Sequence, residues 1–210
     1  MNKTLKRAIY GSIYVAIMWF GTSYSETTFR LLFSFLGIVS IYEMWKLRRG
    51  KTKALAFLYV IIPFCIIQLI ELDYTNITFN RKLILFTFIL TWTFDTFAYI
   101  IGVRFGKNKI MPSISPKKSW EGFIGGFIFT IIASYFSCRY FVSYSFGEAF
   151  IISIILPFTA TAGDFIESHY KREAGMKDSG DFIPGHGGML DRMDAFLITI
   201  PVLYILINIL

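Results

Sequence analysis

Seven long apolar stretches constrain the fold of this chain more than any other feature of its sequence. A helix needs about 20 mostly apolar residues to cross a bilayer, and each stretch approaches that length, although several are shorter. The stretches are residues 8–25, 29–45, 54–70, 83–103, 122–138, 149–163 and 195–210. This pattern predicts an all-α fold, a polytopic helical bundle in a membrane with about seven transmembrane helices.

The composition supports a membrane protein. Of the 210 residues, 55% are hydrophobic and 17% are charged, whereas about a quarter of the residues in a soluble domain are charged. A soluble domain of this size leaves much of its surface in water and could not bury all 23 phenylalanines. We therefore expect one membrane-embedded domain over residues 1–210, in which residues 1–89 form N-terminal helices and residues 90–200 carry most of the polar motifs.

The basic residues fall between the apolar stretches on alternating sides. Seventeen of the 21 lie on the side of the N-terminus, and four lie on the other side: Arg30, Arg81, Lys82 and Arg139. Cytoplasmic segments carry the excess of basic residues, so we expect the N-terminus and both long polar loops in the cytoplasm. This topology explains the net charge of +7 and requires no nucleic acid. We expect the first stretch to be a retained helix rather than a signal peptide, because six more follow.

Three aspartates lie in or beside the second polar loop. Asp191 and Asp194 are three residues apart and would share one face of a helix, and Asp164 lies where the sixth stretch meets the cytoplasm. Carboxylates that converge at a membrane face are costly, and a hard cation that prefers oxygen ligands, such as Mg²⁺, removes that penalty. The alternative is that they form salt bridges with Arg172 and Arg192. The spacing leaves both interpretations open.

Asp95 lies inside the fourth apolar stretch. A charged residue at the centre of a spanning helix costs about 3 kcal/mol, which apolar neighbours outweigh at about 0.3 to 0.6 kcal/mol each. Such residues usually line a polar cavity, and a structural ion pair is the alternative. We expect Asp95 to line a cavity.

Basic clusters and a glycine-rich segment provide candidate phosphate-binding groups. The basic residues combine point charges with planar bidentate donors, and they are Lys117, Lys118, Lys171, Arg172, Lys177 and Arg192. Their alternative role is to fix topology and contact anionic lipid head groups. Residues 184–188 (PGHGG) would let backbone amides approach an anion closely. The spacing of Gly122 and Gly126 predicts close packing between two helices.

Two sets of residues in these loops resemble the motifs of the phosphatidate cytidylyltransferases, also called CDP-diacylglycerol synthases. The downstream set is Ser168, Lys171, Arg172, Lys177, Asp178, Gly180, Ile183, Pro184, His186, Gly187, Gly188, Met189, Asp191, Arg192, Met193 and Asp194. The upstream set is Asp95, Ala98, Tyr99, Gly102, residues 105–107 and residues 115–122. A chance match over the 27 positions of the downstream motif is implausible. The resemblance covers about residues 90–200, and the N-terminal part is similar only in its hydrophobic character.

The resemblance implies a membrane enzyme that transfers the cytidylyl group of CTP to phosphatidic acid, forming CDP-diacylglycerol and pyrophosphate. It implies Mg²⁺ bound by Asp164, Asp191 and Asp194, with a monovalent cation such as K⁺ beside it. The residues that it places in catalysis are Asp164, Lys171, Arg172, Lys177, Asp178, His186, Asp191, Arg192 and Asp194. Those that it places in substrate binding are Asp95, Ser115, Lys117, Lys118, Glu121, Ser168, Gly187 and Gly188.

Other functions remain as alternatives. The lipid phosphate is already an anion near pH 7, so a cytidylyltransferase must hold two polyanions together rather than supply a strong base. A CTP-dependent polyprenol kinase or a CDP-archaeol synthase would share the basic loops, but we do not expect it to carry the full histidine-containing motif. A transporter, suggested by Asp95, would concentrate polar groups near the membrane midplane. We expect a multi-pass protein of the bacterial inner membrane, and a homodimer is one assembly that we consider.

Overall fold

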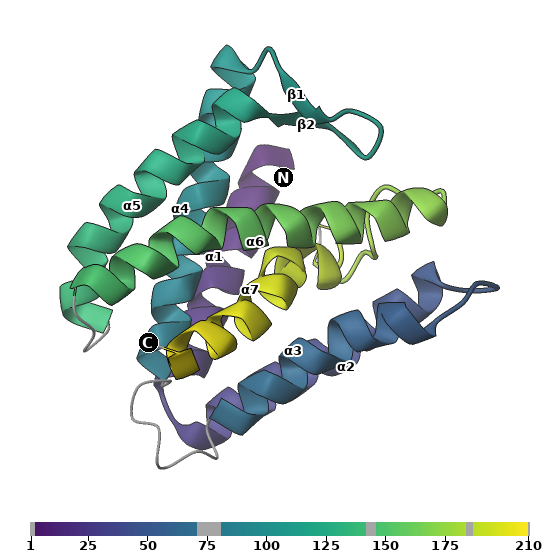
Figure 1. Ribbon diagram of the computed structural model, residues 1–210. Coiled ribbons are helices and arrows are strands. Elements are labelled where there is room, and N and C mark those ends of the chain that lie inside the picture. Colours follow the sequence, from purple (N-terminus) through teal and green to yellow (C-terminus); the bar gives the residue numbers. More distant parts are fainter. Residues whose placement is uncertain (1–2, 71–80, 142–145, 184–186, 210) are drawn as a thin grey trace.

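The computed structural model describes residues 3–70, 81–141, 146–183 and 187–209, and these residues form seven helices and a small hairpin (Figure 1). The helices are α1 (Lys3–Ser23), α2 (Glu26–Leu47), α3 (Ala54–Ile70), α4 (Arg81–Phe105), α5 (Trp120–Phe141), α6 (Phe146–Glu173) and α7 (Leu190–Ile209). The hairpin consists of β1 (Lys109–Met111) and β2 (Ser115–Ser119). The predicted helical bundle is therefore confirmed.

Four of these helices are long and apolar enough to cross a membrane. They are Glu26–Leu47, Arg81–Phe105, Trp120–Tyr140 and Gly147–Glu173, and Ala54–Leu69 is a shorter apolar helix. Prolines lie inside α3, α6 and α7 (Pro63, Pro157 and Pro201), as membrane helices tolerate because their neighbours satisfy the freed backbone groups. The molecule is a multi-pass membrane bundle, and the figure of about seven spans stays a prediction.

The segment between α4 and α5, predicted as a polar loop, contains the β1–β2 hairpin. Its two strands are antiparallel, with Lys109 opposite Ser119 and Met111 opposite Ser115, and the pairing is irregular between these two positions. The amide of Trp120 donates to the carbonyl oxygen of Asn108 at 2.9 Å, where β2 continues into α5. The segment is too short for an alternating pattern of apolar and polar residues to reveal its strands.

Helices α4 and α5 pack side by side, as Figure 1 shows. Glycines allow this approach, because a Cβ at Gly122 would lie 2.6 Å from the carbonyl oxygen of Ala98, and one at Gly126 would lie 2.8 Å from a ring carbon of Phe94. The predicted role of the Gly122–Gly126 spacing is confirmed. The hairpin is thus held at the end of a tightly packed helix pair.

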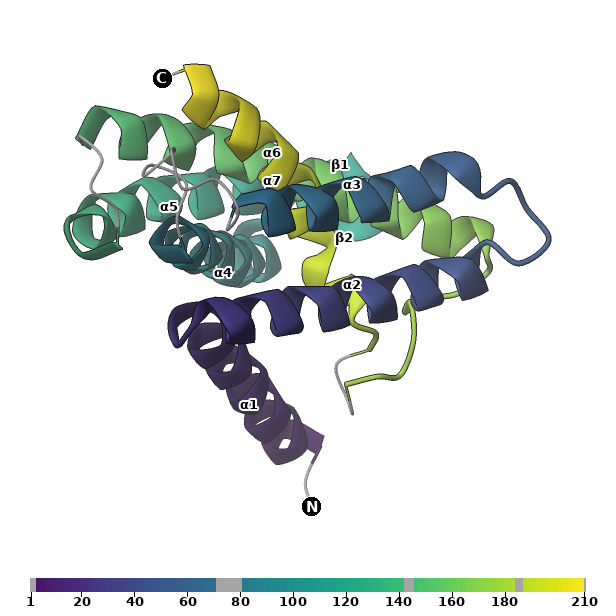
Figure 2. The same cartoon turned by 90° about the horizontal axis from the view of Figure 1, so that it is seen from below.

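Helices α2 and α3 form a second pair on the other side of α7 (Figures 1 and 2). Ser25 begins α2 with a capping box, in which its hydroxyl accepts from the amide of Thr28 at 3.1 Å and its own amide donates to the Thr28 hydroxyl at 3.0 Å. Phe33 of α2, Phe88 of α4 and Phe196 of α7 stack on one another, with ring centroids 5.1 to 6.4 Å apart. This aromatic cluster joins the two helix pairs through α7.

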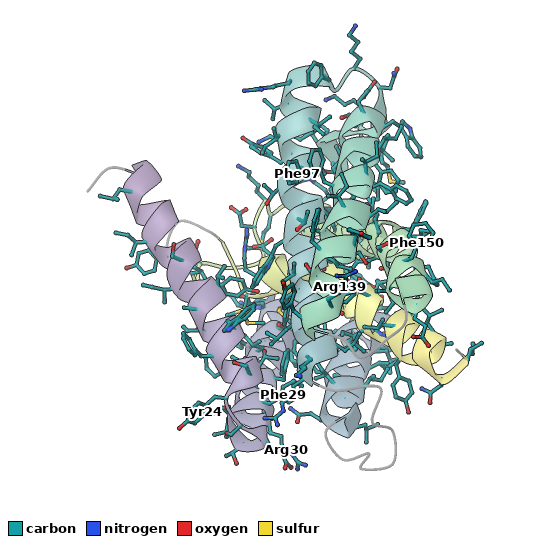
Figure 3. All side chains as sticks on the ribbon, turned by 90° about the vertical axis from the view of Figure 1, so that its left-hand side faces the viewer. Tyr24, Phe29, Arg30, Phe97, Arg139 and Phe150 are labelled. Atoms are coloured by element: carbon teal, nitrogen blue, oxygen red, sulfur yellow. The ribbon has the colours of Figure 1, made fainter. Side chains whose placement is uncertain are left out.

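Helix α1 diverges from the rest of the bundle, as Figures 2 and 3 show. One of its faces is apolar and exposed along its whole length: Leu5, Ile9, Ile13, Ile17 and Phe20. Such a face suits contact with lipid acyl chains. Figure 3 also places Arg30, one of the four basic residues predicted on the non-cytoplasmic side, at the end of the bundle remote from the α4–α5 connection.

Candidate active site

A cavity of about 770 Å³ opens where α4, β2, α5, α6 and α7 meet. Ten charged side chains line it, five acidic and five basic. They are Asp95, Asp164, Asp178, Asp191 and Asp194, with Lys109, Lys117, Lys118, Lys171 and Arg192. The remaining wall is largely apolar and includes Phe94, Val103 and Phe123. A concave site with convergent charges and an apolar wall suits a ligand that is part polyanion and part lipid.

Helix α6 extends ten residues beyond the predicted end of the sixth stretch at residue 163, to Glu173. Asp164, Ser168 and Lys171 therefore lie on helix rather than in a loop, at spacings of four and three residues that place them on one face. Contacts within the helix support the extension, because Ser168 donates to Asp164 Oδ1 at 3.3 Å and Lys171 pairs with Glu167. Polar pairs thus continue a helix whose apolar stretch has ended.

Asp164 forms an ion pair with Lys118, which comes from β2 on the far side of the cavity. The Lys118 ammonium also lies 5.2 Å from the ring centroid of Phe165. The pair joins β2, which carries part of the upstream motif, to α6, four residues before the downstream motif begins. Of the two predicted phosphate-binding lysines of β2, Lys117 and Lys118, only Lys118 forms an ion pair among the described residues.

Lys171 lies between two acids. Its ammonium donates to Asp191 Oδ1 at 2.6 Å and forms an ion pair with Glu167, which is fully buried. The sequence reasoning missed Glu167, although it lies four residues before Lys171, where a helical pair forms. A lysine held by two carboxylates is fixed in position, which a phosphate-binding group requires.

Asp191 is bound by the loop that precedes α7. Its Oδ2 accepts from the amide of Ser179 at 2.9 Å, the hydroxyl of Ser179 at 3.0 Å and the amide of Gly188 at 2.8 Å. Gly187 has a φ of +87°, and a Cβ there would lie 2.7 Å from Asp191 Oδ2. Glycine at position 187 therefore makes room for this carboxylate. Among the described residues, Gly187 and Gly188 support Asp191 and do not line the cavity.

Asp194 reaches the cavity because α6 and α7 touch. A Cβ at Gly163 would lie 2.2 Å from the carbonyl oxygen of Asp194, so only glycine permits this crossing. Asp164 and Asp194 both line the cavity beside it. Asp95 lines the same cavity from α4, and among the described residues it forms no ion pair.

The cavity suits a hard cation, because its five aspartates supply oxygen ligands. Over the part of the chain that the structure describes, no three His, Cys, Asp or Glu side chains converge closely enough to hold a metal as placed. Asp164 and Asp191 are instead paired with Lys118 and Lys171. The alternative interpretation named ion pairs with Arg172 and Arg192, whereas the ion pairs that the described residues show for Asp164 and Asp191 are with lysines.

Several predicted residues lie away from the cavity. Arg172 donates to the backbone oxygens of Ile114 and Met176 at 3.4 and 3.0 Å. Glu121 accepts from the amides of Lys107 and Asn108 and from the Asn108 side chain, which closes the turn before β1. Ser115, Ser168 and Lys177 do not line the cavity either. His186 lies outside the described residues.

Glu43 of α2 is a second acid that the sequence reasoning missed. It is 4% exposed, and its carboxylate accepts from the amides of Met189 and Leu190 and from the Ser179 hydroxyl. The sequence did contain an indication of a buried acid, because Glu43 lies inside the apolar stretch 29–45 just as Asp95 lies inside the stretch 83–103. A buried acid in an apolar helix usually has a specific polar partner.

Comparison with known proteins identifies the relatives of this chain. A sequence profile described as "Cytidylyltransferase family" matches residues 8–210. The phosphatidate cytidylyltransferase of Rickettsia typhi is 37% identical over 197 residues, which cover 90% of this chain and 83% of the relative. That of Rickettsia bellii is 37% identical over 201 residues, with 92% and 84% covered. That of Staphylococcus saprophyticus is 46% identical over 126 residues, with 59% and 48% covered.

The relationship extends beyond the residues 90–200 in which the sequence motifs lie, because the family match also includes α1, α2 and α3. The N-terminal helices are thus part of the family's fold rather than an unrelated hydrophobic addition. Together with the shared motifs, this match places the whole described bundle in one family. The chain belongs to the cytidylyltransferase family.

Proposed function

We propose that this chain is a phosphatidate cytidylyltransferase, which transfers the cytidylyl group of CTP to phosphatidate and releases pyrophosphate. The observation that carries this conclusion is 37% identity to proteins of that name over about nine-tenths of the chain. In the reaction, a phosphate oxygen of the lipid forms a bond to the α-phosphorus of CTP. The bond from that phosphorus to the oxygen that bridges it to the β-phosphorus breaks, and this oxygen leaves with pyrophosphate.

The charges around the cavity fit this reaction. The attacking group and the nucleotide are both anions, so the enzyme must bring them together and align the attacking oxygen with the leaving group. Lys118 is paired with one acid and Lys171 with two, and Lys117, Lys109 and Arg192 line the same cavity. The cavity holds as many acids as cations, so part of the positive charge that two polyanions need would come from a bound metal ion. The apolar wall at Phe94, Val103 and Phe123 suits the glycerolipid.

Mg²⁺ is part of the proposal. Asp164 and Asp194 would hold it, with Asp191 beside them, because their hard oxygens match this cation and they line one cavity. When bound, the ion would supply positive charge that neutralises the phosphates. The ion pairs of Asp164 with Lys118 and of Asp191 with Lys171 keep these carboxylates in place. A monovalent cation such as K⁺ beside Mg²⁺ belongs to the same proposal.

Isotope transfer tests the function directly. Purified protein in detergent is supplied with Mg²⁺, phosphatidate and CTP labelled at either the α- or the γ-phosphorus. We expect label from the α position in lipid and none from the γ position. Transfer of γ label to a polyprenol would instead identify a CTP-dependent kinase, and transfer of α label only to an archaeal ether lipid would identify a CDP-archaeol synthase. Asp164→Asn serves as the inactive control.

The proposal also includes a location. We place the chain in the inner membrane of a bacterium, with the N-terminus and both motif-bearing segments in the cytoplasm, where CTP is available. The distribution of basic residues supports this orientation. Reporter fusions after Lys51, Lys109 and Lys177 should all report a cytoplasmic position, and a periplasmic signal at any one of them would overturn the topology. A homodimer stays a prediction that the mass of the detergent-solubilised protein can test.

A further inference from the structure

Glu43 connects an N-terminal helix without a recognised motif to the loop that carries the motif. It lies near the end of α2, more than 130 residues before its partners in the chain. Its Oε1 accepts from the amide of Met189 at 3.0 Å, and its Oε2 accepts from the amide of Leu190 at 2.7 Å and the hydroxyl of Ser179 at 2.9 Å. Within the described ranges, no basic side chain forms an ion pair with it.

The loop is shaped around this carboxylate. A Cβ at Gly180 would lie 2.7 Å from Glu43 Oε1, and one at Gly188 would lie 2.5 Å from Glu43 Oε2. Both glycines thus allow the backbone to enclose a buried acid that comes from another helix. The hydrogen bonds of Glu43 place the described part of the α6–α7 connection against α2, which it crosses in the view of Figure 2.

The first amides of a helix have no partners within the helix and carry a partial positive charge. Glu43 accepts from the amides at the start of α7, so it acts as an N-cap supplied by a different helix. Hydrogen bonds to an ionised acceptor are about twice as strong as neutral ones. The contact therefore fixes where α7 begins and how its first turn is oriented.

The same contact reaches the site through Ser179. The Ser179 hydroxyl lies between Glu43 Oε2 and Asp191 Oδ2, at 2.9 and 3.0 Å, and its single hydrogen is shared between these two carboxylates. Asp191 in turn accepts from Lys171 at 2.6 Å. A continuous series of contacts thus runs from Glu43 through Ser179 and Asp191 to Lys171, one of the cations that line the cavity.

We propose that Glu43 is a positioning residue for cytidylyl transfer: it sets the start of α7 and, through Ser179, the position of the Asp191 carboxylate. This inference rests on the function proposed above. Glu43 does not line the cavity, so it acts on the reaction only through the groups that it holds. A displacement of about 1 Å in a reacting group can lower a rate about 10²-fold, which sets the size of the effect.

Both carboxylate oxygens are required. The two oxygens accept from two successive backbone amides. In a glutamine, the side-chain NH₂ group replaces one of these oxygens and would point its hydrogens at a backbone N–H. We expect Glu43→Gln to lower kcat about 10²-fold, while the KM for CTP changes less than about threefold. Glu43→Asp keeps the charge but is shorter by one methylene, and we expect a kcat between those of wild type and Glu43→Gln.

Ser40→Ala is the matched control. Ser40 lies one turn before Glu43 on α2, is equally buried, and its hydroxyl has no hydrogen-bond partner among the described residues. It should keep wild-type kcat and thermal stability. A double-mutant cycle of Glu43→Gln with Ser179→Ala adds a second measurement, because residues in one network give non-additive losses. We expect the double variant to lose less than the product of the two single losses.

The outcomes separate this inference from the proposed function. If wild-type protein transfers no α label to phosphatidate, the proposed function fails, whatever Glu43 does. If wild type is active and a folded Glu43→Gln keeps its kcat, the positioning role is wrong. If Glu43→Gln does not fold, Glu43→Asp must show the loss of kcat in its place. Failure of both variants to fold, while Ser40→Ala folds, would assign Glu43 to folding alone and overturn the inference.

Discussion

The two helix pairs of this protein contribute to the site in different ways. In α4–α5 the backbones touch at Gly122 and Gly126, and the pair supplies Asp95 and leads into the hairpin that carries Lys118. In α2–α3 no residue lines the cavity within the described ranges. That pair packs on α7, as in the stacking of Phe33 on Phe196. It also reaches α6 and α7 through polar side chains: Glu43 of α2, Tyr59 of α3, and Arg48 directly after α2.

The attachments of the α2–α3 pair lie at both ends of the loop that carries the motif. Arg48 pairs with Glu173 and lies over the ring of Tyr170, 5.1 Å from its centroid, and Lys51 donates to the carbonyl oxygen of Glu173. These contacts hold the end of α6, while Glu43 holds the start of α7. Groups that face a ligand can thus form a recognisable motif, whereas the groups that hold the motif in place can lie in a segment without one.

The largest effect should follow from the loss of a carboxylate of the cavity. Asp164→Asn, Asp191→Asn and Asp194→Asn each retain almost the same volume but remove a hard anionic ligand, and we expect kcat to fall about 10³-fold or more. Steady-state transfer of α label at saturating Mg²⁺ measures this, with circular dichroism to show that the fold is intact. Substantial activity of Asp194→Asn at limiting Mg²⁺ would rule out its metal role. Asp95→Asn should reduce the rate less.

A large loss of stability should follow from removal of the lysine that neutralises two acids. Lys171→Met leaves Glu167 and Asp191 without their cation in a largely buried place, and breaking such a pair costs about 3–5 kcal/mol. Unfolding by SDS in mixed micelles gives the change in unfolding free energy. Lys177→Met, at an exposed position, should leave that free energy nearly unchanged. Equal effects of the two substitutions would contradict a structural role for the two-acid contact.

A smaller loss should follow from a methyl group in the α4–α5 contact. Gly122→Ala would place a Cβ 2.6 Å from the carbonyl oxygen of Ala98, and such overpacking costs about 1–3 kcal/mol. Gly102→Ala is the matched change on the facing helix, where the nearest atom would lie 3.4 Å away. The thermal midpoint in detergent should fall for Gly122→Ala and stay constant or rise for Gly102→Ala. If Gly102→Ala lowered the thermal midpoint more than Gly122→Ala, close approach of the two backbones would not be what holds the α4–α5 pair together.

The smallest effect should come from one neutral hydrogen bond of the α2–α3 pair. The Tyr59 hydroxyl donates to the carbonyl oxygen of Gly163 at 3.0 Å, and removing it in Tyr59→Phe should cost about 1 kcal/mol. Tyr24→Phe, at a side chain that is 80% exposed, provides the control. A loss of kcat for Tyr59→Phe as large as that for Glu43→Gln would contradict the special role given to Glu43.

Much of the fold could be predicted because one physical pattern, the apolar stretch, governs a membrane helix. The same pattern failed where α6 continues past residue 163, since polar pairs such as Glu167–Lys171 support that extension and apolar content does not. It also failed at the β1–β2 hairpin, where Lys109 and Ser119 pair without any alternation in the sequence. Hydropathy marks the membrane boundary, and a helix can cross that boundary.

The sequence predicted which acids lie at the site but not which residues hold them in place. Asp95, Asp164, Asp191 and Asp194 all line the cavity, because acids placed at or near apolar stretches need a polar environment. Glu43 carried the same signal, but its partners are more than 130 residues away in the chain, so the sequence could not show what it binds. A single sequence reveals an unusual charge more readily than the group that satisfies it.

The contact between Gly163 and Asp194 ties the spacing of two carboxylates to the backbone. A Cβ at Gly163 would lie 2.2 Å from the carbonyl oxygen of Asp194. About one turn further along, α6 and α7 meet again where the Thr159 and Thr199 hydroxyls lie 2.9 Å apart. Asp164 follows Gly163 directly, at about 1.5 Å along the helix. The distance between the backbone positions of Asp164 and Asp194 is therefore set by the packing of two helices and not by the loop that connects them.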